Sequence, residues 1–130
     1  AHLHGETSIE KMAVSAMPCG HCRQFLYEMA DAGRVQILLP DNKVTTLSHL
    51  LPHAFGPKDL GLEAGMLSQT RETLTLLSDT QDELMMAALH AAIKSYSPYA
   101  KAYSGVALRT RDGKILAGSY LENAAFNPGL

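Results

Sequence analysis

The sequence predicts an α/β fold that is divided between two units. Two patterns support this prediction. In residues 12–39, two short apolar runs flank a segment whose apolar residues recur at helical spacing, which is typical of a strand, a helix and a second strand with short connections. In residues 78–121, an amphipathic segment precedes two apolar runs that are joined by a glycine-containing turn. With 130 residues, the chain has the length of about one domain.

The composition limits the kinds of partner that we expect. Lys and Arg number 11 and Asp and Glu 13, so the formal charge is −2 and does not favour a surface built to bind a polyanion. Hydrophobic residues make up 46%, which is ordinary for a globular chain. No apolar run approaches the roughly 20 residues of a membrane span, and no basic segment followed by an apolar one marks a secretory leader. We therefore expect a soluble, cytoplasmic protein without a nucleic-acid or membrane partner.

The first unit is predicted to be a strand–helix–strand arrangement. An apolar run at 12–17 predicts a buried strand. Pro18 then opens a helix in its first turn, where a missing N–H costs nothing, and Gly33 ends that helix. A second buried strand is expected at 35–39, parallel to the first because a helix connects them. Residues 47–61 are rich in proline and glycine and predict a short helix followed by an irregular loop.

The second unit is predicted to open with a long helix. Residues 61–77 have weak patterning and mixed charge, which is typical of a linker. A capping box then predicts the helix start, formed either by Ser78 with Gln81 or by Thr80 with Glu83. The buried face of this helix is expected to consist of Leu84, Met85, Ala88, Leu89, Ala92 and Ile93.

A hairpin is predicted to follow this helix. Residues 103–109 and 114–121 form its two strands, and residues 111–113 form its turn. The first unit starts with a strand that only small and polar residues precede, and the second ends on an uncovered hairpin. We therefore expect both ends to be cut from a longer chain. Because incomplete sheets expose edges and apolar faces, we also expect self-association or a partner.

The two cysteines carry the clearest chemical signal. Cys19 and Cys22 lie three positions apart, directly after Pro18. In the first turn of a helix, free backbone N–H groups lower the pKa of a thiol and favour the thiolate that zinc requires. One helical turn also brings both sulfurs to the same face, near enough to share a tetrahedral ion. A zinc site would still need a further ligand from elsewhere, and a thiol redox pair fits the same spacing.

Several segments resemble one enzyme family. The segment from Pro18 to Gln24 resembles the cysteine motif of the cytidine deaminases, whose signature pairs His-x-Glu with Pro-Cys-x-x-Cys. Residues 51–60 are similar to the end of the catalytic repeat in the two-repeat, dimeric class of this family. Together the similar segments cover most of the chain, and residues 61–77 have no counterpart. The remaining segments follow the first half of the family's core in order: Ser97-Pro98-Tyr99, 104–108, Asp112-Gly113-Lys114 and Glu122-Asn123-Ala124-Ala125.

The order of these segments is reversed relative to one family repeat, because the cysteine motif comes first here. The resemblance therefore implies a window from a tandem chain. Residues 1–60 would be the C-terminal part of the catalytic repeat, 61–77 a linker, and 78–130 the N-terminal part of a second, degenerate repeat. A circular permutation is the alternative. In the family each repeat is an α/β/α sandwich, and the intact protein is a homodimer.

The resemblance also implies a reaction and a metal. It implies zinc-dependent hydrolytic deamination of cytidine or deoxycytidine to uridine or deoxyuridine, with Cys19 and Cys22 as zinc ligands. The family's third ligand is the histidine of a His-Ala-Glu motif whose glutamate moves protons. This motif is absent from the 130 residues, so we expect the chain alone to be inactive. Phe55 aligns with an aromatic residue that packs against the pyrimidine, or it is a plain core or interface residue.

Other polar residues are weaker candidates. His2, His4 and Glu6 would have to fold back to replace the missing motif, so solvated positions are favoured for them. Glu122 and Asn123 match a ribose-binding pair of catalytic repeats. The residues that follow, 125–128, resemble the degenerate repeat, which favours a structural role for this pair.

His21 lies between the cysteines and is expected to point away from the metal. Besides a deaminase and a redox protein, the sequence allows a third hypothesis for the function. It is a non-catalytic zinc-binding and dimerisation module that holds its metal with four ligands. Nothing in the sequence separates cytidine from deoxycytidine as the substrate.

Overall fold

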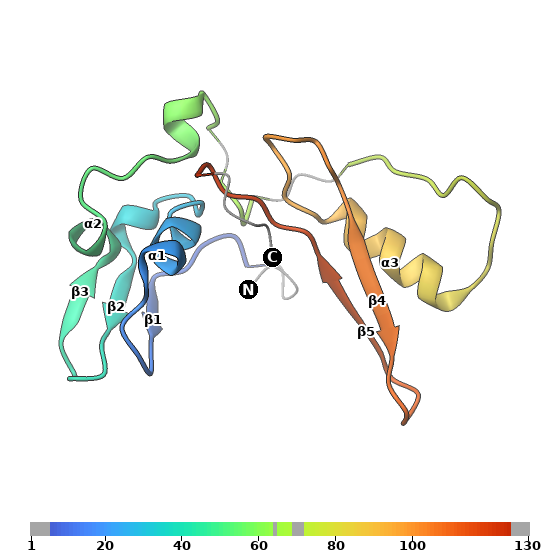
Figure 1. Ribbon diagram of the computed structural model, residues 1–130, viewed down its shortest axis with the longest axis horizontal. Coiled ribbons are helices and arrows are strands. Elements are labelled where there is room, and N and C mark those ends of the chain that lie inside the picture. The colour runs from blue at the N-terminus through green and yellow to red at the C-terminus, as the bar shows by residue number, and fades with distance from the viewer. Residues whose placement is uncertain (1–5, 64, 69–71, 126–130) are drawn as a thin grey trace. The chain divides into compact units, whose positions relative to one another are not determined.

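The chain forms two compact units, each with helical structure and a sheet of its own (Figure 1). The structure is a computed structural model, and it describes residues 6–63, 65–68 and 72–125. Among these, the first unit comprises the residues up to Ser68 together with 123–125, and the second comprises residues 72–122. The predicted α/β class is confirmed.

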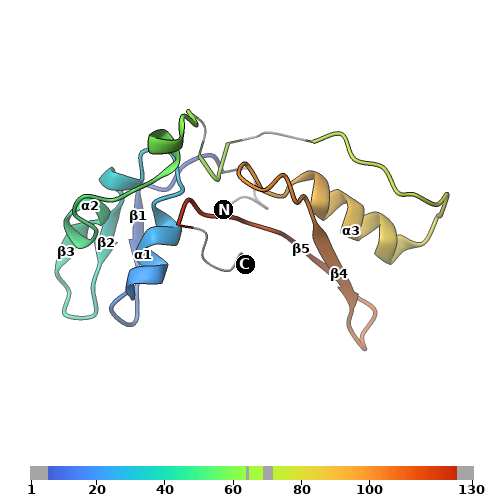
Figure 2. The ribbon, with the colours of Figure 1, turned by 45° about the horizontal axis from the view of Figure 1, so that its top comes forward.

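The first unit contains a mixed sheet of three short strands, β1 (Lys11–Ala13), β2 (Gln36–Leu38) and β3 (Val44–Thr46). They lie side by side in the order β1-β2-β3 (Figures 1 and 2). Strands β1 and β2 pair in parallel, as the sequence predicts, whereas β2 and β3 pair antiparallel. Strand β3 is absent from the sequence-based prediction, because three residues are too few for alternation to stand out.

Among the described residues of this unit, four short helices accompany the sheet: α1 (Gly20–Leu26), η2 (Ala32–Arg34), α2 (Leu47–Leu50) and η3 (Pro57–Leu60). The predicted helix that opens at Pro18 and ends before Gly33 is wrong in extent. The N–H groups of Glu28 and Met29 donate to the carbonyls three residues back, which tightens the chain beyond α1. Asp31 then adopts a left-handed conformation with φ 54°, so the chain turns there rather than at Gly33.

The core of the first unit lies between the sheet and the segments that follow it. Ile37 of β2 and Leu47 of α2 are both fully buried. The predicted strand at 12–17 is shorter and more exposed than expected, because β1 has a neighbour on one side only among the described strands. Met66 and Leu67, which lie in the predicted linker, are buried in this unit. The buried apolar residues are Met29, Ala32, Val35, Ile37, Leu47, Met66, Leu67 and Ala124.

The second unit consists of α3 (Glu83–Ile93) packed along the hairpin of β4 (Gly105–Arg109) and β5 (Ile115–Ser119) (Figure 2). The hairpin is confirmed, with antiparallel strands and a turn in which Gly113 has a φ of 87°. The predicted helix start is wrong. Asp82 caps α3, because its Oδ1 accepts a hydrogen bond from the N–H of Met85 at 3.0 Å.

The predicted apolar face of α3 is only partly buried. Met85 is 43% exposed, and Ala91 is the buried residue of the helix. In the described part of the chain, no helix combines the length and the apolar character needed to cross a membrane.

Helix and hairpin approach each other closely at Gly105. A Cβ at this position would lie 2.4 Å from the carbonyl oxygen of Ala88 and 2.4 Å from the backbone nitrogen of Ala92. Gly118 is on the neighbouring strand β5, and a Cβ there would meet no atom within 4 Å. A comparison of alanine substitutions at these two glycines therefore separates the effect of close packing from the general effect of adding a methyl group to this hairpin.

We expect Gly105→Ala to destabilise the protein by about 1–3 kcal/mol, because the added methyl group must displace helix backbone. We expect Gly118→Ala to change the free energy of unfolding by less than about 0.5 kcal/mol. Urea titration monitored by circular dichroism measures both changes. Equal effects of the two substitutions would contradict the close packing of α3 on β4.

Candidate metal centre

The cysteine motif places two thiols together at the start of α1. Cys19 is the N-cap residue, with an extended backbone (φ −66°, ψ 170°), and Cys22 lies in the first helical turn. Their Sγ atoms are 3.4 Å apart, and both residues are exposed. Two sulfurs that share a zinc ion at a Zn–S distance of about 2.3 Å lie about 3.8 Å apart. The pair therefore fits one half of a tetrahedral zinc site after a small adjustment.

Arg23 holds the turn that carries these thiols. Its Nε donates to the carbonyl of Pro18 at 2.8 Å, and its Nη1 donates to the carbonyl of Leu50 at 2.8 Å. The guanidinium thus joins the residue before Cys19 to the end of α2. Arg23 belongs to the cysteine motif, but its role was not predicted, because its partners are backbone carbonyls that no sequence pattern marks.

Phe55 is attached to the same helix through its backbone. The Nε2 of Gln24 donates to the carbonyl of Phe55 at 2.7 Å, while Phe55 itself remains 47% exposed. The next residue, Gly56, packs against Tyr27, where a Cβ would lie 2.6 Å from a ring carbon. The N–H of Gly56 also donates to Oδ2 of Asp59 at 2.8 Å. This loop is therefore fixed by its backbone and leaves an aromatic side chain accessible.

The electrostatics of the pair favour a thiolate at Cys19. The backbone N–H of Cys22, followed by the thiol of Cys22, lowers the pKa of the Cys19 thiol below its ordinary value. Hydrogen bonds to the charged form have this effect because they stabilise the anion. A lowered pKa means that the thiolate, the form in which cysteine binds metals and reacts as a nucleophile, forms at a lower pH.

The structure adds no third metal ligand from the residues that it describes. Within 6–63, 65–68 and 72–125, no three His, Cys, Asp or Glu side chains are grouped so that they could hold a metal ion. His21 and Glu6 are exposed, whereas His2 and His4 lie outside the described residues. The chemistry of the two thiols fits zinc, and the remaining ligands would have to come from elsewhere.

The carboxylate of Glu122 is already used within the second unit. Its Oε2 accepts hydrogen bonds from the N–H groups of Tyr99 and Ala100, at 3.0 and 3.2 Å. Glu122 is 7% exposed. Asn123 belongs to the first unit, and its Oδ1 accepts the N–H of Ala125 at 3.1 Å. Both side chains thus bind backbone groups, while residues 126–128 of the same motif lie outside the described residues.

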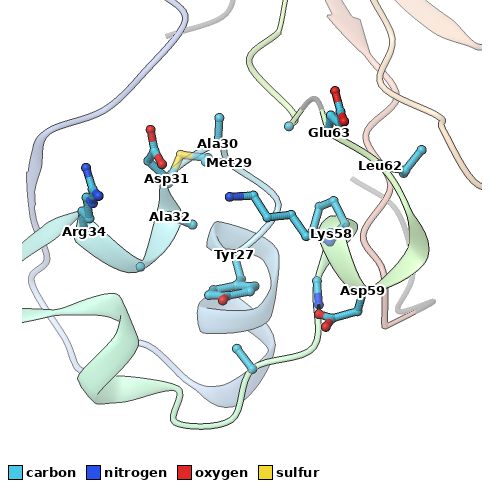
Figure 3. A pocket seen from close by; sticks show the side chains of 15 residues that line it. Tyr27, Met29, Ala30, Asp31, Ala32, Arg34, Lys58, Asp59, Leu62 and Glu63 are labelled. Carbon is cyan, nitrogen blue, oxygen red and sulfur yellow. Dashed lines mark hydrogen bonds between the residues drawn. The ribbon is translucent and has the colours of Figure 1, made fainter.

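A separate hollow of about 460 Å³ lies beyond the C-terminal end of α1 (Figure 3). Its lining comes from two segments: Tyr27 and residues 29–34, and Ala54, residues 56–59, Leu62, Glu63 and Gly65. Figure 3 shows the side chain of Lys58 reaching into it from η3. Cys19, Cys22 and Phe55 do not line this hollow. The hollow is therefore not part of the thiol site.

These features define a class of protein, namely an α/β unit with an exposed thiol pair at the start of a helix that lies between two parallel strands. A family model described as "Cytidine and deoxycytidylate deaminase zinc-binding region" matches residues 47–130. The chain therefore belongs to the cytidine and deoxycytidylate deaminase family, and the metal of this family is zinc. The matched residues do not include Cys19 and Cys22, so the assignment of these two residues depends on their geometry and on the motif.

Curated relatives match the chain over its whole length. A cytidine deaminase of Shewanella pealeana is 51% identical over 130 residues, which are 100% of this chain and 43% of the relative. A cytidine deaminase of Aeromonas hydrophila is 49% identical over 131 residues, which are 100% of this chain and 44% of the relative. The chain thus spans less than half the length of the curated relatives that it matches.

The lowered pKa of Cys19 predicts a pH-dependent reactivity. In the metal-free protein we expect Cys19 to reach half of its maximal alkylation rate at a lower pH than the same residue in the urea-unfolded chain, because only the thiolate reacts. Cys22→Ala removes the thiol donor but keeps the backbone N–H. The pH of half-maximal alkylation of Cys19 should therefore move only part of the way toward its value in the unfolded chain. Iodoacetamide labelling followed by mass spectrometry across pH measures this. An unchanged midpoint on unfolding would show that the hydrogen bonds do not form.

Proposed function

We propose that this chain is part of a two-repeat, zinc-dependent cytidine deaminase that hydrolyses cytidine or deoxycytidine to uridine or deoxyuridine. In this reaction water adds at C4 of the pyrimidine and ammonia leaves. The observation that carries the proposal is the pair of adjacent thiols at the start of α1, in a chain whose full length matches proteins named cytidine deaminase. Such an enzyme would act on a small nucleoside in the cytoplasm as a homodimer.

In this proposal, Cys19 and Cys22 are two of the three protein ligands of zinc. The bound metal supplies a Lewis acid and lowers the pKa of a coordinated water. The Arg23 bonds to the carbonyls of Pro18 and Leu50 keep the thiol turn in place. The exposed Phe55, whose backbone is tied to α1, packs against the flat face of the pyrimidine.

The same proposal holds that the 130-residue chain is inactive by itself. The sequence contains no His-Ala-Glu motif, and the described residues supply no third metal ligand. The missing histidine and the glutamate that moves protons would come from residues beyond these 130 or from another chain. Relatives more than twice as long as this chain are consistent with that arrangement.

We also propose that residues 1–60 end a catalytic repeat, that 61–77 link the repeats, and that 78–130 begin a degenerate one. Support comes from Glu122, whose carboxylate binds the backbone of Tyr99 and Ala100 instead of facing an open site. A repeat that has lost its metal site would keep this motif for the fold alone.

We expect the purified chain to bind about one zinc ion and to produce no uridine from cytidine. The double variant Cys19→Ala/Cys22→Ala should lose the metal, because it removes both sulfur ligands. His21→Ala is the matched control, since His21 is exposed between the two cysteines and should be dispensable. Inductively coupled plasma mass spectrometry measures the zinc, and a coupled ammonia assay measures turnover.

Each result of this experiment has a distinct meaning. Zinc without turnover supports both the ligand assignment and the inactivity of the chain. Zinc-dependent turnover would contradict the inactivity, because some residue other than the His-Ala-Glu motif would then complete the site. Absence of zinc, or its retention in the double variant, would contradict the assignment of Cys19 and Cys22. X-ray absorption spectroscopy that shows the zinc held by four protein ligands, with no position for water, would favour the non-catalytic module.

A further inference from the structure

Glu28 is a fully buried carboxylate that lies two residues beyond α1. Its exposed fraction is 0%. Its Oε1 accepts a hydrogen bond of 2.5 Å from the backbone N–H of Ala124, which is 96 residues away in the sequence. Burial of a carboxylate is costly unless hydrogen bonds compensate for the lost water. A buried acid that binds such a distant backbone group therefore requires a structural explanation.

Three segments of the first unit meet at Glu28. The first is the chain that leaves α1. The second contains Met66, whose N–H donates to the backbone carbonyl of Glu28 at 2.8 Å, and Gly65, where a Cβ would lie 2.3 Å from the nitrogen of Ala30. The third is the segment of Ala124. Glu28 thus joins one segment through its main chain and another through its side chain.

The third segment is deeply packed despite its position near the end of the described chain. Asn123 is 2% exposed and Ala124 is 1% exposed. The Oδ1 of Asn123 accepts the N–H of Ala125 at 3.1 Å, which shapes the segment into a turn. Figure 2 draws this segment in red, and it belongs to the first unit although residues 72–122 belong to the second. Burial of this kind needs a partner for the Ala124 N–H, and Glu28 provides it.

We propose that Glu28 is a positioning residue that holds residues 123–125 in the first unit. The unit that carries Cys19 and Cys22 is then completed by a segment that follows the hairpin of the second unit. The role of Glu28 is to accept the Ala124 N–H inside the core. This inference is independent of zinc binding and of catalysis, so it can fail or hold separately from the proposed function.

Amide hydrogen exchange measured by NMR on the full 130-residue chain tests this role. Glu28→Leu keeps a similar side-chain volume but removes the acceptor, so the exchange rate of the Ala124 amide should rise at least about tenfold. Glu28→Gln keeps a carbonyl oxygen as acceptor and should raise that rate less than about threefold. The Met66 amide donates to the Glu28 main chain, so its protection should persist in both variants.

Glu10→Leu is the matched control, because Glu10 is an exposed glutamate of the same unit and should leave the Ala124 amide protected. An Ala124 rate in Glu28→Leu within about twofold of the wild type, or equal rates in the Leu and Gln variants, would overturn the proposal. If Glu28→Leu does not fold, the exchange rates of the Ala124 amide in the wild type and in Glu28→Gln decide whether the proposal holds. Exchange of the wild-type Ala124 amide at the rate of an unfolded peptide would overturn the proposal without any variant.

Discussion

The parallel pairing of β1 with β2 is the constraint on which the thiol site depends. Parallel strands cannot be joined by a tight turn, so the chain between them must cross over. Helix α1 lies in this crossover and begins soon after β1 ends. The start of α1 is thereby set beside the end of a strand, and Cys19 and Cys22 occupy that position. The place of the thiols in the chain therefore follows from this crossover, whereas the spacing of the two sulfurs follows from one helical turn.

A unit of this size has a small core, and hydrogen bonds from side chains to distant carbonyls and N–H groups add to its order. Arg23 joins Pro18 to Leu50, and Gln24 binds the carbonyl of Phe55. Both residues lie on α1, between the thiols and the end of the helix. The helix that presents the cysteines is therefore also the element to which the following loops are attached. A change in these anchors would alter the thiol turn without touching a sulfur.

The sequence allowed the βαβ order, the hairpin and the adjacent thiols to be predicted, because each depends on local patterns: apolar runs, a glycine turn and one helical turn. The end of α1 at Leu26 was missed because the chain tightens there into hydrogen bonds to carbonyls three residues back, which no local pattern marks. The capping residue Asp82 was missed because two capping boxes nearby had the expected spacing. The roles of Arg23 and Glu28 depend on backbone partners 27 and 96 residues away, which no local pattern encodes.

The motif around Glu122 shows why residue type alone does not assign a site. Glu122 and Glu28 are both buried acids, and both accept hydrogen bonds from backbone N–H groups of segments that are distant in sequence. A carboxylate in that situation is satisfied by the fold and has less capacity for a ligand. The exposed thiols of Cys19 and Cys22 are the opposite case, since their sulfurs lie next to each other at the surface. Of these groups, the thiols are therefore the ones that the fold leaves accessible to a ligand.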